Sequence, residues 1–255
     1  MALKLIKPNW PAANNITAFT TTRLGGVSKP PYDSLNLALH VKDNPQNVAT
    51  NRQLVADLLP SQPYWLNQTH SDNIAILEDV SDLILPFDAS VTTQKNKICA
   101  VMTADCLPLL MTNKQGSVVM AVHAGWQGLV NRIVVKSIGC LVSRYNVNAK
   151  DLLVWLGPAI SSRHFEIGDE VKCKLQASMV TQSDTPFVKG DKPGKWFADV
   201  YQIAREQLLE VGVSDVYGGE YCTYEDDELF FSHRRATHQG SSSTGRMVSV
   251  ICLDD

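Results

Sequence analysis

The segment from Ile98 to Val122 constrains the fold more than any other part of the sequence, because three short apolar runs follow one another there. The runs cover residues 98–103, 107–112 and 117–122, are rich in Val, Ile, Leu and Met, and are separated by tight turns. Apolar runs of this length between turn residues are typical of strands that are buried on both faces. The segment therefore predicts the centre of a sheet, with other elements packed over it.

Amphipathic helices are predicted on both sides of this segment. Asn44 is a suitable N-cap with Pro45 at N1, and the helix that they begin is expected to end before Pro60. Further helices are predicted over residues 129–145, 169–179 and 198–211, strands over 16–22, 35–41, 64–66, 73–77, 151–156, 216–223, 229–232 and 247–253, and loops over 181–195 and 236–245. Neither an internal repeat nor a change in composition marks a linker, so we expect residues 1–255 to form one mixed α/β domain.

The overall charge does not favour nucleic acids or membranes as partners. The formal net charge is −3 and the isoelectric point is near 6.1, without the basic excess that nucleic-acid or membrane surfaces need. The sequence has neither a signal peptide's apolar region nor a run approaching the roughly 18 apolar residues of a membrane span.

The six cysteines of the sequence form no C-x-x-C pair, so most are expected to be reduced and buried. We expect a cytoplasmic protein, and a monomer.

Three potential metal ligands stand where apolar strands end. His70, Cys106 and His123 each follow or end such a strand, and a polar or glycine-containing turn comes after each of them. If three strands of one sheet end at the same edge, these side chains meet. Two imidazoles and a thiolate suit a tetrahedral Zn²⁺ whose fourth position is left to water or substrate, and the ion would lower the pKa of a bound water toward roughly 7. Their separations in the chain match no compact metal-binding motif.

Two carboxylates and one arginine could assist such a site. Asp105, next to Cys106, and Asp72 could orient an imidazole or carry protons. Because neighbouring strand residues point to opposite faces, Asp105 and Cys106 can both face the site only if the strand has ended before them. Beside Arg23, a pair of glycines permits positive φ, so backbone N–H groups there could converge on an anion; a plain turn is the alternative.

Seven short motifs occur in order along the sequence. They are Thr-Thr-Arg-Leu-Gly-Gly-Val-Ser (21–28), Ser-Leu-Asn-Leu (34–37), Trp-Leu-Asn-Gln-Thr-His (65–70), Thr-Ala-Asp-Cys-Leu-Pro (103–108), His-Ala-Gly-Trp-Gln-Gly (123–128), Leu-Gly-Pro-Ala-Ile (156–160) and Thr-Gly-Arg-Met (244–247). With these motifs the chain closely resembles the YfiH family, also called the peptidoglycan editing factors, over nearly its whole length. That family was formerly described as multicopper polyphenol oxidases, and is now described as purine nucleoside phosphorylases with adenosine deaminase activity.

The resemblance implies a fold and a site. The fold is a layered α/β sandwich of mixed sheets with flanking helices, and the metal is zinc, held by His70, Cys106 and His123, with copper as the weaker alternative. The implied activity is cleavage of adenosine- or inosine-type nucleosides by phosphate, with adenosine deamination at the same site. The three ligands and Asp105 would be catalytic, Arg23 is the first candidate for phosphate, and Asn36 is a candidate for the ribose or base.

One departure from the family concerns phosphate. Gln127 stands where the family usually has Arg, and a charge-assisted hydrogen bond contributes roughly 1.5 to 3 kcal/mol. Smaller departures are Thr69 and Ser71 beside His70, where Val and Gly are common, and a longer loop over residues 236–244. The three metal-ligand positions match the family, so the departures bear on phosphate affinity and not on the metal.

Three other functions remain open from the sequence. A copper polyphenol oxidase could use the two histidines and the cysteine with Met102, Met111 or Met120, but the six histidines of the chain include no His-x-His pair. A metal-dependent hydrolase could act on peptidoglycan precursors. A zinc-stabilised binding protein without activity would need a fourth protein ligand. The H-x-E and P-C-x-x-C signature of the nucleic-acid deaminases is absent.

Overall fold

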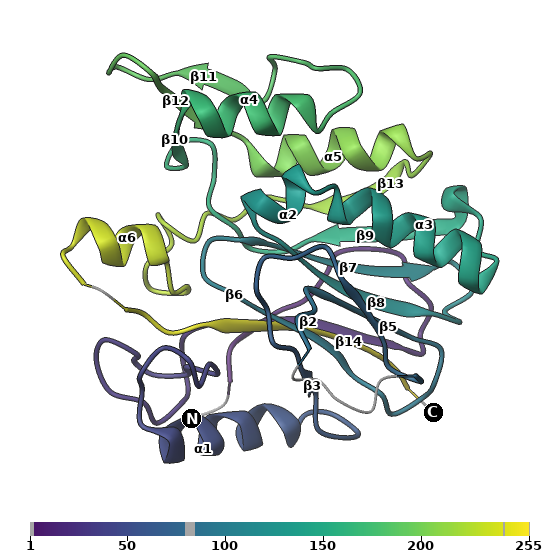
Figure 1. Cartoon of the computed structure of the whole chain (residues 1–255). Helices are drawn as coiled ribbons and strands as arrows, with labels where there is room; N and C mark the ends of the chain where they lie inside the picture. The colour runs from purple at the N-terminus through teal and green to yellow at the C-terminus, as the bar shows by residue number, and fades with distance from the viewer. Residues whose placement is uncertain (1–2, 80–84, 242, 255) are drawn as a thin grey trace.

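Two mixed β-sheets lie face to face between layers of helices in the computed structural model, which describes residues 3–79, 85–241 and 243–254 (Figure 1). The first sheet has the strand order β1 (Leu5–Ile6), β2 (Ile16–Thr21), β14 (Met247–Leu253), β6 (Cys99–Thr103) and β3 (Tyr64–Trp65). The second has the order β13 (Asp215–Gly218), β9 (Leu152–Leu156), β7 (Leu107–Asn113), β8 (Val119–Ala124), β5 (Ala89–Thr92) and β4 (Ile74–Ile76).

The alternation of side chains along the central strands divides the interior into separate cores. Leu109 of β7 packs in a core that the six-stranded sheet shares with the helices, whereas Leu110 packs between the two sheets. Val101 and Ile251 of the five-stranded sheet also face that middle core, and Val250 lies in a third core on the outer face. Every residue of β6, β7, β8, β9 and β14 is buried, which confirms the predicted burial on both faces and the layered α/β class.

Helices cover both outer faces. α1 (Pro45–Ala56) contributes Val55 to the outer core of the five-stranded sheet. Its predicted start is confirmed, because the Asn44 side chain accepts a hydrogen bond from the Gln46 N–H at 2.8 Å. On the other side lie α2 (Trp126–Val130), α3 (Ile133–Tyr145), α4 (Asp169–Ala177) and α5 (Val200–Glu210) (Figure 1), and a 3₁₀ turn (Ala149–Asp151) precedes β9.

The single helix predicted over residues 129–145 was wrong. The structure divides it into α2 and α3 at Arg132, which adopts the left-handed conformation with φ 62°. The Arg132 side chain donates a hydrogen bond to the carbonyl of Ser178 and pairs with Glu210. Contacts with α4 and α5 therefore hold a conformation that helix periodicity along the sequence does not reveal.

Other predicted elements also differ. Residues 35–41 form an irregular segment instead of a strand, because the Asn36 side chain takes up the backbone N–H and carbonyl of Ala38 that a strand partner would use. Residues 35–38 and Val41 are buried, whereas Leu39 and His40 are exposed. The strand predicted over residues 229–232 is absent, and β5 was not predicted. The loop predicted over 181–195 contains β11 (Phe187–Lys189) and begins β12 (Lys195–Ala198), which form a small sheet with β10 (Glu166–Gly168).

Residues 233–238 form a helix that was not predicted. Ser232 caps α6 (His233–His238), which extends into the expected loop over residues 236–245; Ser242 of that loop lies outside the described residues. By contrast, the predicted end of α5 is confirmed, since Gly212 has φ 84° just after the helix. Among the described residues, no helix has the length and hydrophobicity required to cross a membrane.

Candidate metal centre

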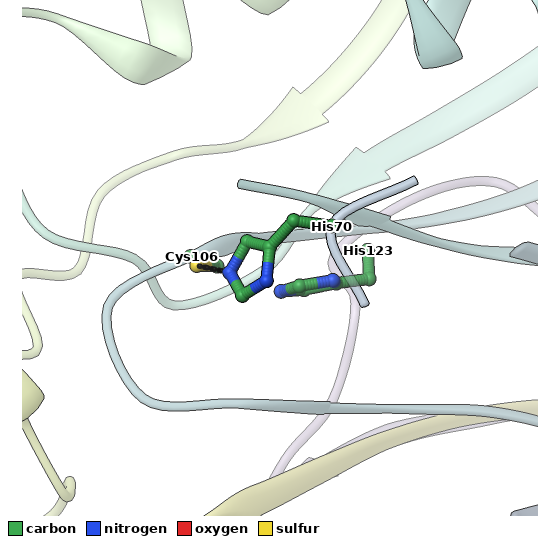
Figure 2. Close-up of side chains that lie close together, drawn as sticks. All are labelled: His70, Cys106 and His123. Carbon is green, nitrogen blue, oxygen red and sulfur yellow. Dashed lines mark hydrogen bonds between the residues drawn. The ribbon is translucent and has the colours of Figure 1, made fainter. Parts of the chain in front are cut away.

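His70, Cys106 and His123 meet at the joint between the two sheets (Figure 2). Their ligand atoms all lie within 4.8 Å of one another, and the Cys106 Sγ is 3.6 Å from the His70 Nε2. The two imidazole rings are 4.8 Å apart between centroids and nearly perpendicular, at 71°. The three side chains therefore form one compact group, as the sequence predicts.

The three ligands do not come from strands of one sheet, so that part of the prediction was wrong. His70 follows β3 of the five-stranded sheet, and His123 lies within β8 of the six-stranded sheet. Cys106 belongs to the turn through which the chain leaves β6 in one sheet and enters β7 in the other. The group exists because this turn crosses between the sheets, an arrangement that local sequence patterns do not specify.

Asp88, which was not predicted, holds both histidines. Its fully buried carboxylate accepts hydrogen bonds from the backbone N–H groups of Thr69, His70 and Ser71 at 3.1, 3.0 and 2.6 Å, and from the Ser71 hydroxyl at 2.7 Å. It also contacts the His123 Nδ1 at 2.7 Å. Burial raises the pKa of Asp88, but hydrogen bonds and the His123 ring outweigh it, so the pKa lies below its ordinary value. An ionised Asp88 fixes the proton on His123 Nδ1 and leaves Nε2 free for a metal.

No strong sequence signal marks Asp88. It immediately precedes β5, a short strand of small residues that was itself not predicted, and its partners are reached only through the folded chain. His70 also adopts a left-handed conformation with φ 61°, which the three N–H bonds to Asp88 stabilise. A carboxylate before a small-residue strand is the only local hint.

The electrostatics of the group favour the metal-binding form of the cysteine. Burial raises the pKa of Cys106, but His123 and His70 outweigh this effect and lower it to about 6. The pKa of His123 is raised to about 9, since the Cys106 charge and the Asp88 carboxylate outweigh the lowering by burial. Without a metal, the pair is therefore a thiolate beside an imidazolium, and a cation that replaces the imidazolium proton meets a thiolate that is already formed.

The spacing of the donor atoms fits a tetrahedral zinc ion. Zinc–sulfur and zinc–nitrogen bonds of about 2.3 and 2.0 Å at a tetrahedral angle place the two donors about 3.5 Å apart, close to the observed 3.6 Å between Cys106 and His70. Because the group has three members among the described residues, a tetrahedral ion held by them would keep one coordination position for solvent or substrate. Gly125 is needed beside it, because an added Cβ would lie 2.6 Å from the His70 Cδ2.

Two cavities meet at this group. The smaller, of about 250 Å³, is lined by the three ligands and by polar residues such as His40, His233 and Arg246. The larger, of about 430 Å³, is lined by His70, Cys106 and mainly apolar residues. His70, Ala104, Cys106 and His233 contribute to both cavities. A reactive centre there can therefore contact two bound molecules, or two parts of one.

Asp105 borders the larger cavity, but its carboxylate is already engaged. One oxygen accepts a hydrogen bond from the Thr223 hydroxyl at 2.7 Å, and the other accepts one from the Arg234 N–H at 2.6 Å, near the start of α6. Asp105 has φ 91° and lies past the end of β6. The strand has thus ended before Asp105, as a shared site with Cys106 requires, and the observed contacts hold the Cys106 turn against α6.

Arg23 and Asn36 lie outside both cavities. Arg23 pairs with Asp33 at 3.1 Å and donates to the carbonyls of Asp33 and Asp227, and the N–H of Gly26 is used by the Ser34 hydroxyl. The residues that line these cavities include neither Arg23 nor Asn36, which is fully buried. The structure thus brings Asp105 to the metal group, but not Arg23 or Asn36.

Among the remaining sequence candidates, Met102 alone lines one of these two cavities. Asp72 pairs with Lys136, and Gln127 is exposed on α2 and lines neither cavity. Met111 and Met120 are fully buried in the helix-side core, whereas Met102 lines the smaller cavity. The loss of Arg at position 127 therefore removes no group from either cavity.

Comparisons with known proteins agree with this fold and identify a family. The family model described as multi-copper polyphenol oxidoreductase laccase matches residues 17–254. A protein of Escherichia coli (strain K12) named purine nucleoside phosphorylase YfiH is 44% identical over 252 residues, with 98% of this chain and 99% of the relative covered. A Haemophilus influenzae protein named purine nucleoside phosphorylase is 41% identical, with 99% of this chain and 100% of the relative covered.

Solved structures show the same architecture. A Neisseria meningitidis protein superposes with a TM-score of 0.89 at 39% identity and full coverage of both chains. A Bacillus licheniformis hypothetical protein named YfiH superposes with a TM-score of 0.88 at 32% identity, with 94% of each chain covered. Sequence and structure agree over nearly the entire length, and the chain belongs to the YfiH family, whose sequence model carries the laccase description.

Proposed function

We propose that this protein is a zinc-dependent purine nucleoside phosphorylase that also deaminates adenosine. The relatives named purine nucleoside phosphorylase are 41 to 44% identical over almost the whole chain. The observation that carries the proposal is the three-ligand group with an open position, placed where two cavities of different character meet. A two-substrate reaction between a nucleoside and phosphate needs such a junction.

The larger cavity suits the nucleoside. Trp126 and Phe165 offer aromatic surfaces on which a purine can stack, and Ile160, Ile167 and Val171 provide an apolar wall. Arg234, whose guanidinium carbon lies 5.5 Å from the centroid of the Phe165 ring, adds hydrogen-bond donors for ring nitrogens or ribose hydroxyls. A purine held there would present its sugar to the wall formed by His70 and Cys106.

Phosphorolysis at this junction exchanges one bond for another. A phosphate oxygen forms a bond to the anomeric carbon while the glycosidic C–N bond breaks, and the electron pair of that bond leaves with the purine, which takes up a proton. His233, which lines both cavities, is the group placed to carry that proton. The products are ribose 1-phosphate and the free base.

His70, Cys106 and His123 would hold the zinc ion, with Asp88 fixing both histidines. A zinc ion there would supply Lewis acidity at its open position, which serves charge development on either substrate. For adenosine without phosphate, water replaces the exocyclic amine and inosine and ammonia result. Trp126 and Phe165 would hold the purine for both reactions, since both need the base beside the same group.

A product analysis tests the proposal. Zinc-loaded protein is incubated with adenosine or inosine, with and without inorganic phosphate, and the bases, ribose 1-phosphate, inosine and ammonia are separated. We expect free base and ribose 1-phosphate only when phosphate is present, and inosine from adenosine in its absence. Cys106→Ala should abolish both reactions and reduce bound zinc, because it removes the thiolate ligand.

A second cysteine serves as a matched control. Cys173→Ala removes an exposed thiol on α4, and it should leave turnover and zinc content at the level of the unmodified protein. Full turnover in Cys106→Ala would exclude the metal-dependent mechanism. Stoichiometric copper with oxidation of phenols, or release of an amino acid from a muramyl peptide with nucleosides inert, would each replace the proposal by another function.

A further inference from the structure

We propose that the smaller cavity is the phosphate site, and that Arg246 is the residue that binds the phosphate. This inference rests on the proposed phosphorylase function and assigns its second substrate to a specific place. Arg246 directly precedes β14 and was not among the residues that the sequence indicated, although it lies in the Thr-Gly-Arg-Met motif. Four observations on this cavity support the assignment.

Arg246 forms no ion pair with a carboxylate of the described residues. Its Nη1 donates to the carbonyls of Thr244 and Gly245 at 2.9 and 3.1 Å, and no carboxylate of the described residues lies within ion-pair distance of it. Arg23 differs in this respect, because it is paired with Asp33. A half-buried guanidinium without a carboxylate is an arrangement that an anionic ligand completes.

No carboxylate of the described residues lines the cavity. Arg246, His40 and His233 line it beside the metal ligands, and neither Asp nor Glu is among its lining residues. The larger cavity, in contrast, has charges of both signs in its wall, since Asp105 and Glu166 lie there together with Lys195 and Arg234. An anion therefore meets a cation and imidazole donors without an Asp or Glu of the described residues in the smaller cavity, and meets carboxylates as well as cations in the larger one.

Thr103 adds an unused hydrogen-bonding group to the smaller cavity. Its residue is 1% exposed, it lines the cavity, and its Oγ1 has no hydrogen-bond partner among the described residues. Thr103 ends β6 directly opposite Met247 in the register with β14, so it lies at the same strand edge as Arg246. A buried hydroxyl without a hydrogen-bond partner is unfavourable, and a phosphate oxygen would satisfy it.

The backbone of Arg246 is fixed by the segment that contains Asn36. The Arg246 N–H donates to the Asn36 Oδ1 at 3.0 Å, and the Leu37 N–H donates to the Arg246 carbonyl at 3.3 Å. Asn36 thus acts as a positioning residue for Arg246 from a place outside the cavity. These hydrogen bonds join the motifs at residues 34–37 and 244–247, which lie far apart in the chain and side by side in the structure.

Phosphate binding can be measured without turnover. Inorganic phosphate is titrated by calorimetry into zinc-loaded protein and into Arg246→Gln, which removes the charge and keeps much of the side-chain length. We expect phosphate binding to weaken at least tenfold in Arg246→Gln, with a matching rise in the phosphate KM. Arg246→Lys should recover part of the affinity, and Thr103→Val should weaken it several-fold. Zinc content and melting temperature are recorded for each variant to show that it is folded.

Arg23→Gln tests whether Arg23, the alternative anion-binding residue, binds the phosphate instead. Unchanged phosphate affinity in both Arg246→Gln and Arg246→Lys, or a loss confined to Arg23→Gln, would overturn the assignment. If phosphate binds through Arg246 but no nucleoside is cleaved, the site is established and the phosphorylase function fails. If cleavage needs phosphate but not Arg246, the function holds and the assignment fails.

Discussion

Asp88 illustrates how one buried carboxylate can organise two ligands from different sheets. It binds the backbone on both sides of His70 and the ring of His123. Replacing it affects zinc binding without removing a ligand. We expect Asp88→Asn to lower zinc affinity about 10- to 100-fold, as for other partners of metal-bound histidines, and to destabilise the fold, because three N–H donors lose a charged acceptor.

Competition with a chromogenic chelator measures the zinc affinity of this variant. Asp72→Asn is the matched control, because Asp72 lies in the loop that carries His70 but pairs with Lys136 at the surface. Its zinc affinity should be unchanged. Equal losses in the two variants would show that the loop as a whole, and not the Asp88 contacts, determines the affinity.

The Cys106–His123 pair makes the metal-free protein sensitive to pH. The folded pKa of Cys106 is lowered to about 6, so its contribution to stability is present above the unfolded pKa of about 8.5 and is lost as pH falls through 6. The folded pKa of His123 is raised to about 9, so its contribution is lost as pH rises through 9. The pair therefore stabilises the metal-free fold most between these two values.

The rate of Cys106 alkylation in metal-free protein, followed by mass spectrometry across pH, should rise with a midpoint near 6. His123→Asn should move that midpoint upward, because it removes the cation beside the thiolate. A midpoint near the ordinary cysteine value in the intact protein would contradict the electrostatic account of the site.

At the scale of elements, the metal group leaves no room for a side chain at Gly125, the residue before α2. An added Cβ at Gly125 would lie 2.6 Å from the His70 ring and 3.1 Å from the Cys106 Sγ, so Gly125→Ala should displace a ligand and weaken zinc binding. Gly139→Ala is the control, since nothing lies within 4 Å of its added Cβ inside α3. That variant should gain about 0.5 to 1 kcal/mol in stability, measured by urea unfolding, and bind zinc normally.

The elements differ in how far the sequence could predict them. The β7–β8 hairpin and the start of α1 follow from local apolar runs and from Asn44-Pro45, and both were predicted. β5 was missed because Ala89-Ser90-Val91-Thr92 has little apolar pattern, although all four residues are buried. The break at Arg132 was missed because it depends on Ser178 and Glu210, far along the chain.

The same distinction holds for the site. The three ligands could be predicted because each follows or ends an apolar strand and lies in a family motif. Asp88 and Arg246 could not, because their importance comes from neighbours that only the packed sheets bring together. Arg23 was favoured for its adjacent glycines, yet those glycines serve a turn whose N–H groups bind Ser34 and Asn51.

For the whole molecule, a metal at this group would connect the two sheets, since its ligands come from both and from the turn between them. Zinc should therefore raise the melting temperature, and free zinc at 100 times its dissociation constant should add about 2.7 kcal/mol to the free energy of unfolding. Calorimetric melting with increasing zinc, and again after chelation, measures this effect. Cys106→Ala should show little dependence on zinc; an equal dependence would place the stabilising metal elsewhere.

The position of β14 has a consequence for biosynthesis. β14 lies between β2 and β6, and pairs Ser249 with both Thr20 and Val101. During translation, β2 can therefore pair with β14 only after residues 247–253 have left the ribosome. Pairings between such distant segments close slowly, so the five-stranded sheet can be completed only after residues 247–253 have been synthesised. A metal whose His70 ligand follows β3 of this sheet would then meet its complete site only after β14 has taken its place.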